Sequence, residues 1–218
     1  VRGDIQNRFL VRTDGSVFAG AVAETTQASD IYVDANGGND DNDGLSEATA
    51  KKTLAVALGL AQSGDTVSVA EGVYSNGTGT VTKPSATYVA RAVVPEGVTL
   101  RASGAVERTV ILGEGSSSGD AEGRGPGAVS GVYALANARV EGFTITGGRS
   151  VASAEDAGYA GGVYGEGYNK TVFANCIISN NVARFGGAVA RCDVANSLVV
   201  GNRALYRASA FRQANAYN

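Results

Sequence analysis

The sequence predicts an all-β fold: a single-stranded right-handed parallel β-helix (a solenoid) with an N-terminal capping α-helix. The main observation is a short phrase that returns in the second half of the chain at intervals of roughly 20 to 30 residues. It occurs at Gly131-Val132-Tyr133, Gly162-Val163-Tyr164, Gly187-Ala188-Val189 and Ser209-Ala210-Phe211. Repeats of this length indicate stacked units, each of which buries its apolar face against the next unit.

Composition supports a chain that turns many corners. Glycine accounts for 31 of the 218 residues, whereas proline occurs 3 times. Glycine tolerates the positive φ angles that tight corners require. The formal charge of −3 gives no reason to expect a nucleic-acid partner, and no apolar run is long enough for a membrane-spanning helix.

The chain divides into three parts. Residues 1–29 form an extension in which Thr13-Asp14-Gly15-Ser16 separates two apolar runs, a pattern typical of a β-hairpin. Residues 30–75 form a capping segment, since Leu54, Ala57, Leu58 and Ala61 follow helical spacing and predict a helix over about 51–62. Residues 76–218 carry short aliphatic strands and form the coils, which continue into further chain or are covered by another chain.

The capping segment carries a family resemblance. Its phrases are Ile31-Tyr32-Val33-Asp34, Asn42-Asp43-Gly44-Leu45-Ser46, Lys52-Thr53-Leu54, Gly64-Asp65-Thr66-Val67 and Gly72-Val73-Tyr74. This order resembles the entry segment of right-handed parallel β-helix proteins of the pectate-lyase-like superfamily, as a surface or adhesin-like member rather than an enzyme family. The resemblance implies the fold, and a fold alone does not establish an activity.

Stacked coils place equivalent side chains above one another. The first phrase predicts an interior column of Val132, Val163, Ala188 and Ala210. A second phrase, alanine followed by asparagine, returns at Ala136-Asn137, Ala174-Asn175, Ala195-Asn196 and Ala214-Asn215. It predicts a structural ladder at one corner, formed by Asn137, Asn175, Asn196 and Asn215, whose amides would bond along the axis. Cys176 and Cys192 differ by about five residues in coil position, which disfavours a disulfide unless a corner folds them together.

One acidic stretch has the oxygen-rich spacing of a metal site. Asn39, Asp41 and Asp43 alternate before Gly44, as in half of a calcium loop. The residue at the twelfth position is Ala50 rather than glutamate, which excludes an EF-hand. The pattern favours an Asx-rich turn that leads into the capping helix, with Ca²⁺ as the alternative.

The sequence contains no histidine, which excludes histidine-based triads and histidine metal sites. No catalytic residue is assigned. We therefore expect a secreted or cell-surface protein with a structural, adhesive or self-assembly role, whose partners are copies of itself end to end or the remainder of a longer chain. The alternative is a polysaccharide lyase, hydrolase or glycan-binding module for an acidic polysaccharide, with a groove formed by Glu155, Asp156, Arg184 and Arg191.

Overall fold

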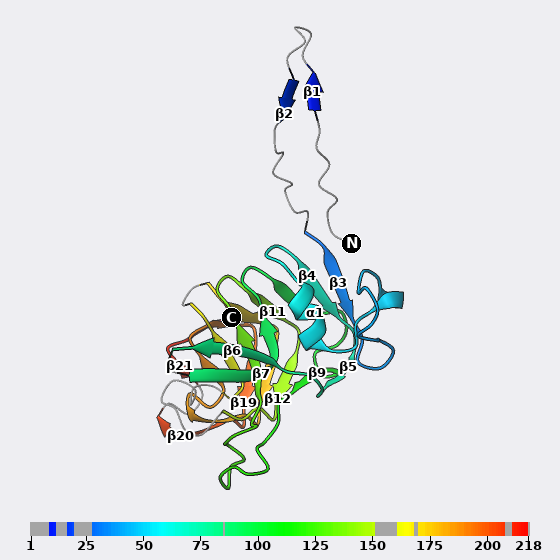
Figure 1. Cartoon of the computed structure of the whole chain (residues 1–218). Helices are drawn as coiled ribbons and strands as arrows, with labels where there is room; N and C mark the ends of the chain where they lie inside the picture. The colour runs from blue at the N-terminus through cyan, green and yellow to red at the C-terminus, as the bar shows by residue number, and fades with distance from the viewer. Residues whose placement is uncertain are drawn as a thin grey trace.

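The computed structural model describes residues 9–11, 17–19, 28–84, 86–150, 161–167, 170–207 and 211–217. Within these ranges the chain winds as a right-handed parallel β-helix, and three long sheets form its sides (Figure 1). This confirms the predicted fold class. None of the described helices has the length and apolar character needed to cross a membrane.

The central coils each contribute one strand to each of the three sheets, whereas the coils at the two ends do not contribute to every sheet. Sheet I contains β6 (Gly79–Lys83), β7 (Ala86–Val94), β10 (Ser130–Ala134), β13 (Val163–Gly165), β17 (Val189–Ala190) and β21 (Phe211–Arg212). Sheet II contains β3 (Asp30–Val33), β4 (Thr66–Val69), β8 (Thr99–Ala102), β11 (Arg139–Glu141), β14 (Val172–Ala174), β18 (Asp193–Ala195) and β22 (Asn215–Tyr217). Sheet III contains β5 (Gly72–Tyr74), β9 (Thr109–Leu112), β12 (Thr144–Thr146), β15 (Ile177–Ser179) and β19 (Leu198–Val200).

Two smaller pairings lie outside these sheets. Strands β16 (Val182–Phe185) and β20 (Arg203–Arg207) pair in parallel, and β1 (Phe9–Val11) and β2 (Val17–Ala19) pair antiparallel in the N-terminal extension. Among the strands of the three main sheets, β6 and β7 form the antiparallel pair.

The interior column of sheet I differs from the prediction by one residue. Val132 pairs with Val163, but Val163 pairs with Val189 rather than with Ala188. Ala188 is buried, yet it precedes β17 and stands where the preceding coil has Gly162. Because successive residues of a strand face opposite sides, the one-residue difference decides which side chain faces inward. The predicted fourth member, Ala210, lies outside the described residues, and Phe211 pairs with Val189.

The prediction of a single asparagine ladder was wrong, because the four residues occupy three different positions. Asn175 and Asn196 do stack at the corner between sheets II and III, with φ of 54° and 46°. Asn137 lies at the corner before sheet II, and Asn215 lies within β22 opposite Asp193. Asparagine tolerates left-handed backbone better than most residues, so it recurs at several kinds of corner rather than at one.

Asn181 and Asn202, which directly precede β16 and β20, form an amide ladder that was not predicted from the sequence. The Nδ2 of Asn181 donates to the carbonyl of Ile145 and to Oδ1 of Asn202, both at 3.0 Å. Its Oδ1 accepts from the backbone amide of Gly148 at 2.8 Å. These bonds satisfy a fully buried polar side chain and join three successive coils.

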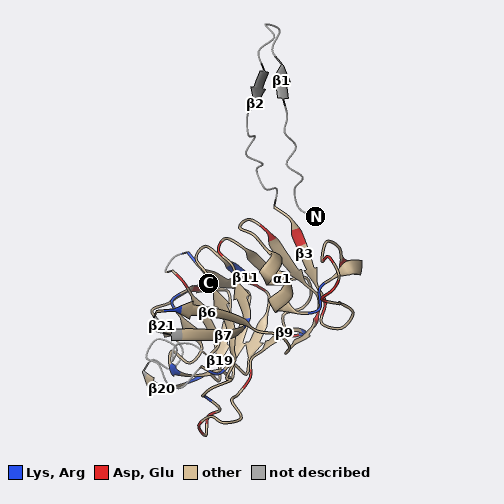
Figure 2. Cartoon of the chain, in the orientation of Figure 1, with Lys and Arg blue, Asp and Glu red and all other residues tan. Residues whose placement is uncertain are grey.

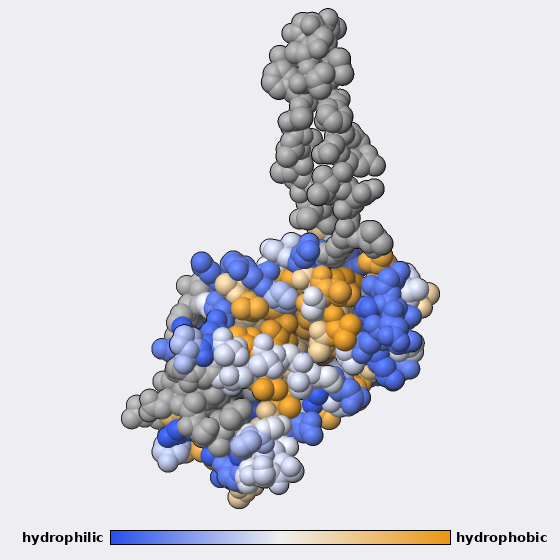
Figure 3. All heavy atoms as spheres, in the orientation of Figure 1, coloured by the Kyte–Doolittle hydropathy of each residue, from blue (hydrophilic) through white to orange (hydrophobic). Residues whose placement is uncertain are grey.

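The N-terminal end of the solenoid is closed. Helix α1 (Leu54–Leu60) lies inside the predicted range and begins at Thr53, whose hydroxyl accepts from the amide of Val56. Its apolar side buries Leu54, Ala57 and Leu58 against the first coils, while Val56 and Leu60 are exposed. Apolar residues gather on the surface near this end of the solenoid (Figure 3). The free edge of β3 bonds to the segment that includes the 3₁₀ turn η1 (Glu47–Thr49): Tyr32 donates to Gly44, and Lys51 donates to Tyr32. An edge covered in this way cannot pair with another chain.

The two cysteines are buried and carry free thiols. Desolvation raises the pKa of the Cys176 thiol to about 11, and it raises that of Cys192 as well. Both side chains are part of the apolar interior. Their role is therefore packing.

Candidate functional site

A pocket of about 360 Å³ lies on the outer face of sheet I. We refer to it as the tyrosine pocket, and its lining residues are Lys83, Tyr88, Tyr133, Tyr164, Glu166, Gly167 and Arg191. They come from the β6–β7 hairpin, from β10, from β13 and the turn after it, and from the residue after β17. Its volume falls within the usual range for sites that bind small ligands.

Three tyrosines packed against one another form the wall of this pocket, and two of them are stacked. Tyr133 and Tyr164 are register partners on neighbouring strands, and their ring centroids lie 4.9 Å apart with an interplanar angle of 19°. The ring of Tyr88 lies 4.9 Å from Tyr133 and 5.2 Å from Tyr164. Alternation along the strands causes this arrangement, because Val132 and Val163 point inward and the next residue of each strand points outward. The tyrosine rings are packed together and form a rigid wall.

A carboxylate connects two edges of the pocket. Glu166 accepts a hydrogen bond of 2.5 Å from the hydroxyl of Tyr133 and an ion pair of 2.6 Å from Nζ of Lys83. Lys83 ends β6, whereas Glu166 follows β13, so two distant segments meet here. Burial raises the pKa of the Tyr133 hydroxyl, and the adjacent Glu166 carboxylate raises it further. The hydroxyl therefore remains a hydrogen-bond donor at neutral pH.

Arg191 supplies the second cation of the pocket. It follows β17 directly and has a left-handed backbone, with φ of 57°. Its NH1 donates to the hydroxyl of Tyr164 at 3.3 Å, and its Cζ lies 6.0 Å from the centroid of that ring. The described lining residues thus combine two cations with one carboxylate.

The structure does not join the four residues of the predicted groove. Arg191 lines the tyrosine pocket, whereas the Arg184 guanidinium lies 5.2 Å from the Phe185 ring centroid and 4.9 Å from that of Tyr206. Glu155 and Asp156 lie outside the described residues. Arg184 and Arg191 therefore do not line a common pocket, as the predicted groove would require.

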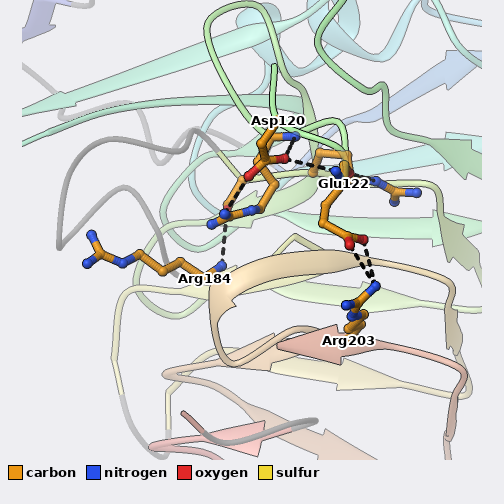
Figure 4. A network of polar contacts seen from close by, with 7 residues as sticks. Asp120, Glu122, Arg184 and Arg203 are labelled. Atoms are coloured by element: carbon orange, nitrogen blue, oxygen red, sulfur yellow. Dashed lines mark hydrogen bonds and ion pairs between the residues drawn. The ribbon is translucent and has the colours of Figure 1, made fainter. Parts of the chain in front are cut away.

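Near Arg184, polar contacts attach the loop before β10 to a later coil (Figure 4). NH1 of Arg203 donates to both carboxylate oxygens of Glu122, at 2.7 and 2.8 Å, and Arg124 pairs with Asp120 at 2.5 Å. The side chain of Arg184 points away from these carboxylates (Figure 4). In the view of Figure 2 the charged residues are dispersed along the coils. This corner therefore anchors a long loop.

The acidic stretch folds as a hydrogen-bonded turn. Oδ1 of Asn39 accepts from the amide of Asp41, and Oδ1 of Asp43 accepts from the amide of Leu45 and the hydroxyl of Thr49. These two hydrogen bonds lower the pKa of the Asp43 carboxyl, and the bond from the Leu45 amide has the larger effect. The described part of the chain contains no cluster of three or more acidic, cysteine or histidine ligands. The structure thus matches the Asx-rich turn and gives no support to a calcium site at Asn39, Asp41 and Asp43.

Among the residues that line the tyrosine pocket, Arg191 is the one that was predicted from the sequence as a site residue. The sequence does contain a pattern that indicates Tyr133 and Tyr164. In both Gly131-Val132-Tyr133 and Gly162-Val163-Tyr164, an inward-facing valine is followed by a tyrosine. Alternation alone would have placed both tyrosines outside and in register. Lys83 and Glu166 carry no local signal, because they meet through the fold.

This chain resembles known proteins in its structure, and not detectably in its sequence. The sequence matches no protein-family model and no curated protein. A solved structure of the native GH136 lacto-N-biosidase from Eubacterium ramulus aligns with a TM-score of 0.40 and 15% identity, covering 78% of this chain and 36% of that one. The selenomethionine derivative of that enzyme aligns with a TM-score of 0.37 and 14% identity, covering 77% of this chain and 44% of that one. The chain therefore spans less than half the length of these structures.

Proposed function

We propose that this chain is a glycan-binding β-helix module of a secreted or cell-surface adhesive protein, and that the tyrosine pocket holds a sugar unit. The observation that carries the proposal is the cluster of Tyr88, Tyr133 and Tyr164 beside three charged side chains. A sugar presents both C–H groups and hydroxyls. It therefore suits a wall that combines aromatic rings with polar hydroxyl groups.

Binding is better supported than hydrolysis. Glycoside hydrolysis generally uses two carboxyl groups on either side of the scissile bond. Among the described lining residues, Glu166 is the one carboxylate, and it already bonds to Tyr133 and Lys83. The arrangement can orient a ligand, and it offers no described acid and base pair.

The test is calorimetric titration of the chain with a panel of neutral and anionic hexasaccharides. We expect at least one glycan to bind, and we expect Tyr164→Ala to weaken that binding by about 10-fold or more, since a buried aromatic contact is removed. The matched control is Tyr206→Ala, which removes a tyrosine that is 70% exposed and outside the pocket. Absence of binding to every glycan, or equal affinities of the two variants, would contradict the proposal. Chromatography of the glycan after incubation checks for cleavage, and its products would favour the lyase or hydrolase alternative.

A second proposal concerns self-assembly through the last described coil. Strands β19, β21 and β22 each have one neighbour, and a cavity of about 440 Å³ between them is lined by Val194, Ser197, Val199, Phe211, Ala216 and Tyr217. An open sheet edge beside apolar side chains favours addition of another coil, from a second copy or from further chain. Sedimentation velocity at rising concentration tests the first case. We expect larger species that Ala216→Lys abolishes, and a monomer at all concentrations would contradict it.

A further inference from the structure

We infer that Glu166 and Lys83 recognise a vicinal diol of the sugar in the tyrosine pocket: Oε2 of Glu166 accepts a hydrogen bond from one hydroxyl, and Nζ of Lys83 donates to the neighbouring hydroxyl. This inference rests on the proposed function of the same pocket. It adds the chemical group of the glycan that is recognised and the two residues that recognise it.

The two oxygens of the Glu166 carboxylate differ in their partners. The hydroxyl of Tyr133 donates to Oε1 at 2.5 Å, and Nζ of Lys83 lies 2.6 Å from the same oxygen. Among the residues that the structure describes, Oε2 has no hydrogen-bond or ion-pair partner. Each oxygen of a carboxylate has two lone pairs that can accept. Oε1 is therefore fully used, whereas Oε2 keeps its whole capacity as an acceptor.

This free acceptor is accessible. Glu166 lines the tyrosine pocket, and its side chain is 22% exposed. In the described part of the chain, the buried side-chain atoms that lack a partner both belong to Arg124, so Oε2 of Glu166 is in contact with solvent. A carboxylate needs a hydrogen from its ligand, and a sugar hydroxyl provides one. A carboxylate or sulfate group on a ligand provides none at neutral pH.

Lys83 places a donor beside this acceptor. Its ammonium group has three hydrogens, and the bond to Glu166 uses one of them. The Lys83 side chain is 41% exposed, so the remaining hydrogens can reach a ligand. Because Nζ is held at Oε1, it stands next to the carboxylate whose other oxygen accepts. Neighbouring hydroxyls of a sugar ring can act as one donor and one acceptor, and a vicinal diol therefore matches this pair.

The pair is held in position before any ligand arrives. The amide of Glu166 donates to the carbonyl of Ala134 at 2.9 Å, which fixes its backbone to the end of β10. Tyr133, which orients the carboxylate, is itself stacked on Tyr164. Little side-chain freedom is therefore lost on binding, and more of the interaction energy appears as affinity.

The experiment titrates the chain with the methyl glycosides of mannose, galactose and glucose, and with analogues in which fluorine replaces one hydroxyl at a time. Fluorine has a similar size and no hydrogen to donate. NMR spectroscopy measures the dissociation constants. We expect at least one hexoside to bind, and we expect replacement of one particular hydroxyl to weaken binding by about 10-fold or more, because a hydrogen bond to a charged acceptor is lost.

Two variants assign this loss to the pair. Glu166→Gln keeps an oxygen for Tyr133 and Lys83 and puts a donor in place of Oε2. The parent hexoside should bind to it about 10-fold more weakly, and the sensitive fluorine analogue should bind as well as the parent, since partners in one hydrogen bond are coupled. Lys83→Met should abolish the effect of fluorine at the neighbouring carbon in the same way. Glu71→Gln is the matched control, because it makes the same change outside the pocket, and it should leave every dissociation constant unchanged.

The outcomes separate this inference from the proposed function. Equal sensitivity to fluorine in the wild type and in both pocket variants would overturn the roles of Glu166 and Lys83 and leave glycan binding intact. The same conclusion follows if none of the methyl hexosides binds and a longer glycan does. If neither the hexosides nor the longer glycans bind, the proposed function itself is wrong. Circular dichroism verifies that each variant is folded, and either pocket variant alone is sufficient for the test.

Discussion

The inside of the solenoid and the outer face of sheet I are built from adjacent residues, yet they serve different purposes. Val132 and Val163 point into a fully buried column, and Tyr133 and Tyr164, one residue further along, pack against one another outside it. The inner positions need apolar volume, which several residue types could supply. The outer positions use one residue type whose hydroxyls bond to Glu166 and Arg191. The outward tyrosines are themselves buried in a second, smaller apolar cluster. Under the proposed function they contribute to recognition as well as to packing.

The largest effect on stability is expected from the interior. Phe173 is a fully buried side chain of sheet II, and Phe173→Ala should lower the free energy of unfolding by about 3–5 kcal/mol because it leaves a cavity. Urea unfolding followed by circular dichroism measures this loss. Phe173→Leu is the matched control and should cost less, since it retains most of the volume. Loss of glycan affinity in correctly folded Phe173→Leu would break the proposed separation of roles.

A smaller effect is expected on the outer face. Tyr133→Phe removes the hydroxyl that donates to Glu166 and retains the stacked ring. The free energy of unfolding should change by about 1.5 kcal/mol or less, because Lys83 still pairs with the carboxylate. Glycan affinity should fall several-fold, since Glu166 loses one of the two groups that orient it. A destabilisation as large as that of Phe173→Ala would show that the hydrogen bond from Tyr133 to Glu166 contributes as much to stability as a buried ring of the interior.

The smallest effect concerns an exposed ion pair at the edge of sheet III. The Arg108 guanidinium, bonded to both carboxylate oxygens, and the amide of Ala105 lower the pKa of Glu71 to about 2. A carboxyl whose pKa is lower in the folded state stabilises the fold above its unfolded pKa, and this contribution is lost as the pH falls toward about 2. The pair is solvent-exposed, so the effect is small.

Melting temperatures between pH 5 and pH 2 test this ion pair. The wild type should lose more stability over this interval than Glu71→Gln, which cannot ionise. Parallel curves for the two proteins would show that the pair contributes nothing measurable. Glycan affinity at pH 7 should be the same in both, because Glu71 does not line the tyrosine pocket.

Local sequence patterns predicted which elements form better than they predicted how the coils align with one another. The spacing of Leu54, Ala57 and Leu58 predicted a helix, and α1 buries these three residues. The repeated phrases predicted coils, but treating Gly187 as the equivalent of Gly162 placed Ala188 in the interior column in place of Val189. Hydrogen bonds between strands set this register, and they depend on where each strand begins after its preceding loop. A repeat in the sequence does not contain that information.

Sequence alone determined that side chains alternate between the interior and the surface along short strands, and that a helix precedes the coils, because both are properties of neighbouring residues. Only the tertiary structure decided which outward side chains meet. Tyr133 and Tyr164 come together because their strands lie side by side in register. Tyr88 and Lys83 reach them and Glu166 from the β6–β7 hairpin. The alignment of coils along the axis depends on the lengths and shapes of the loops between them, and no local pattern encodes these.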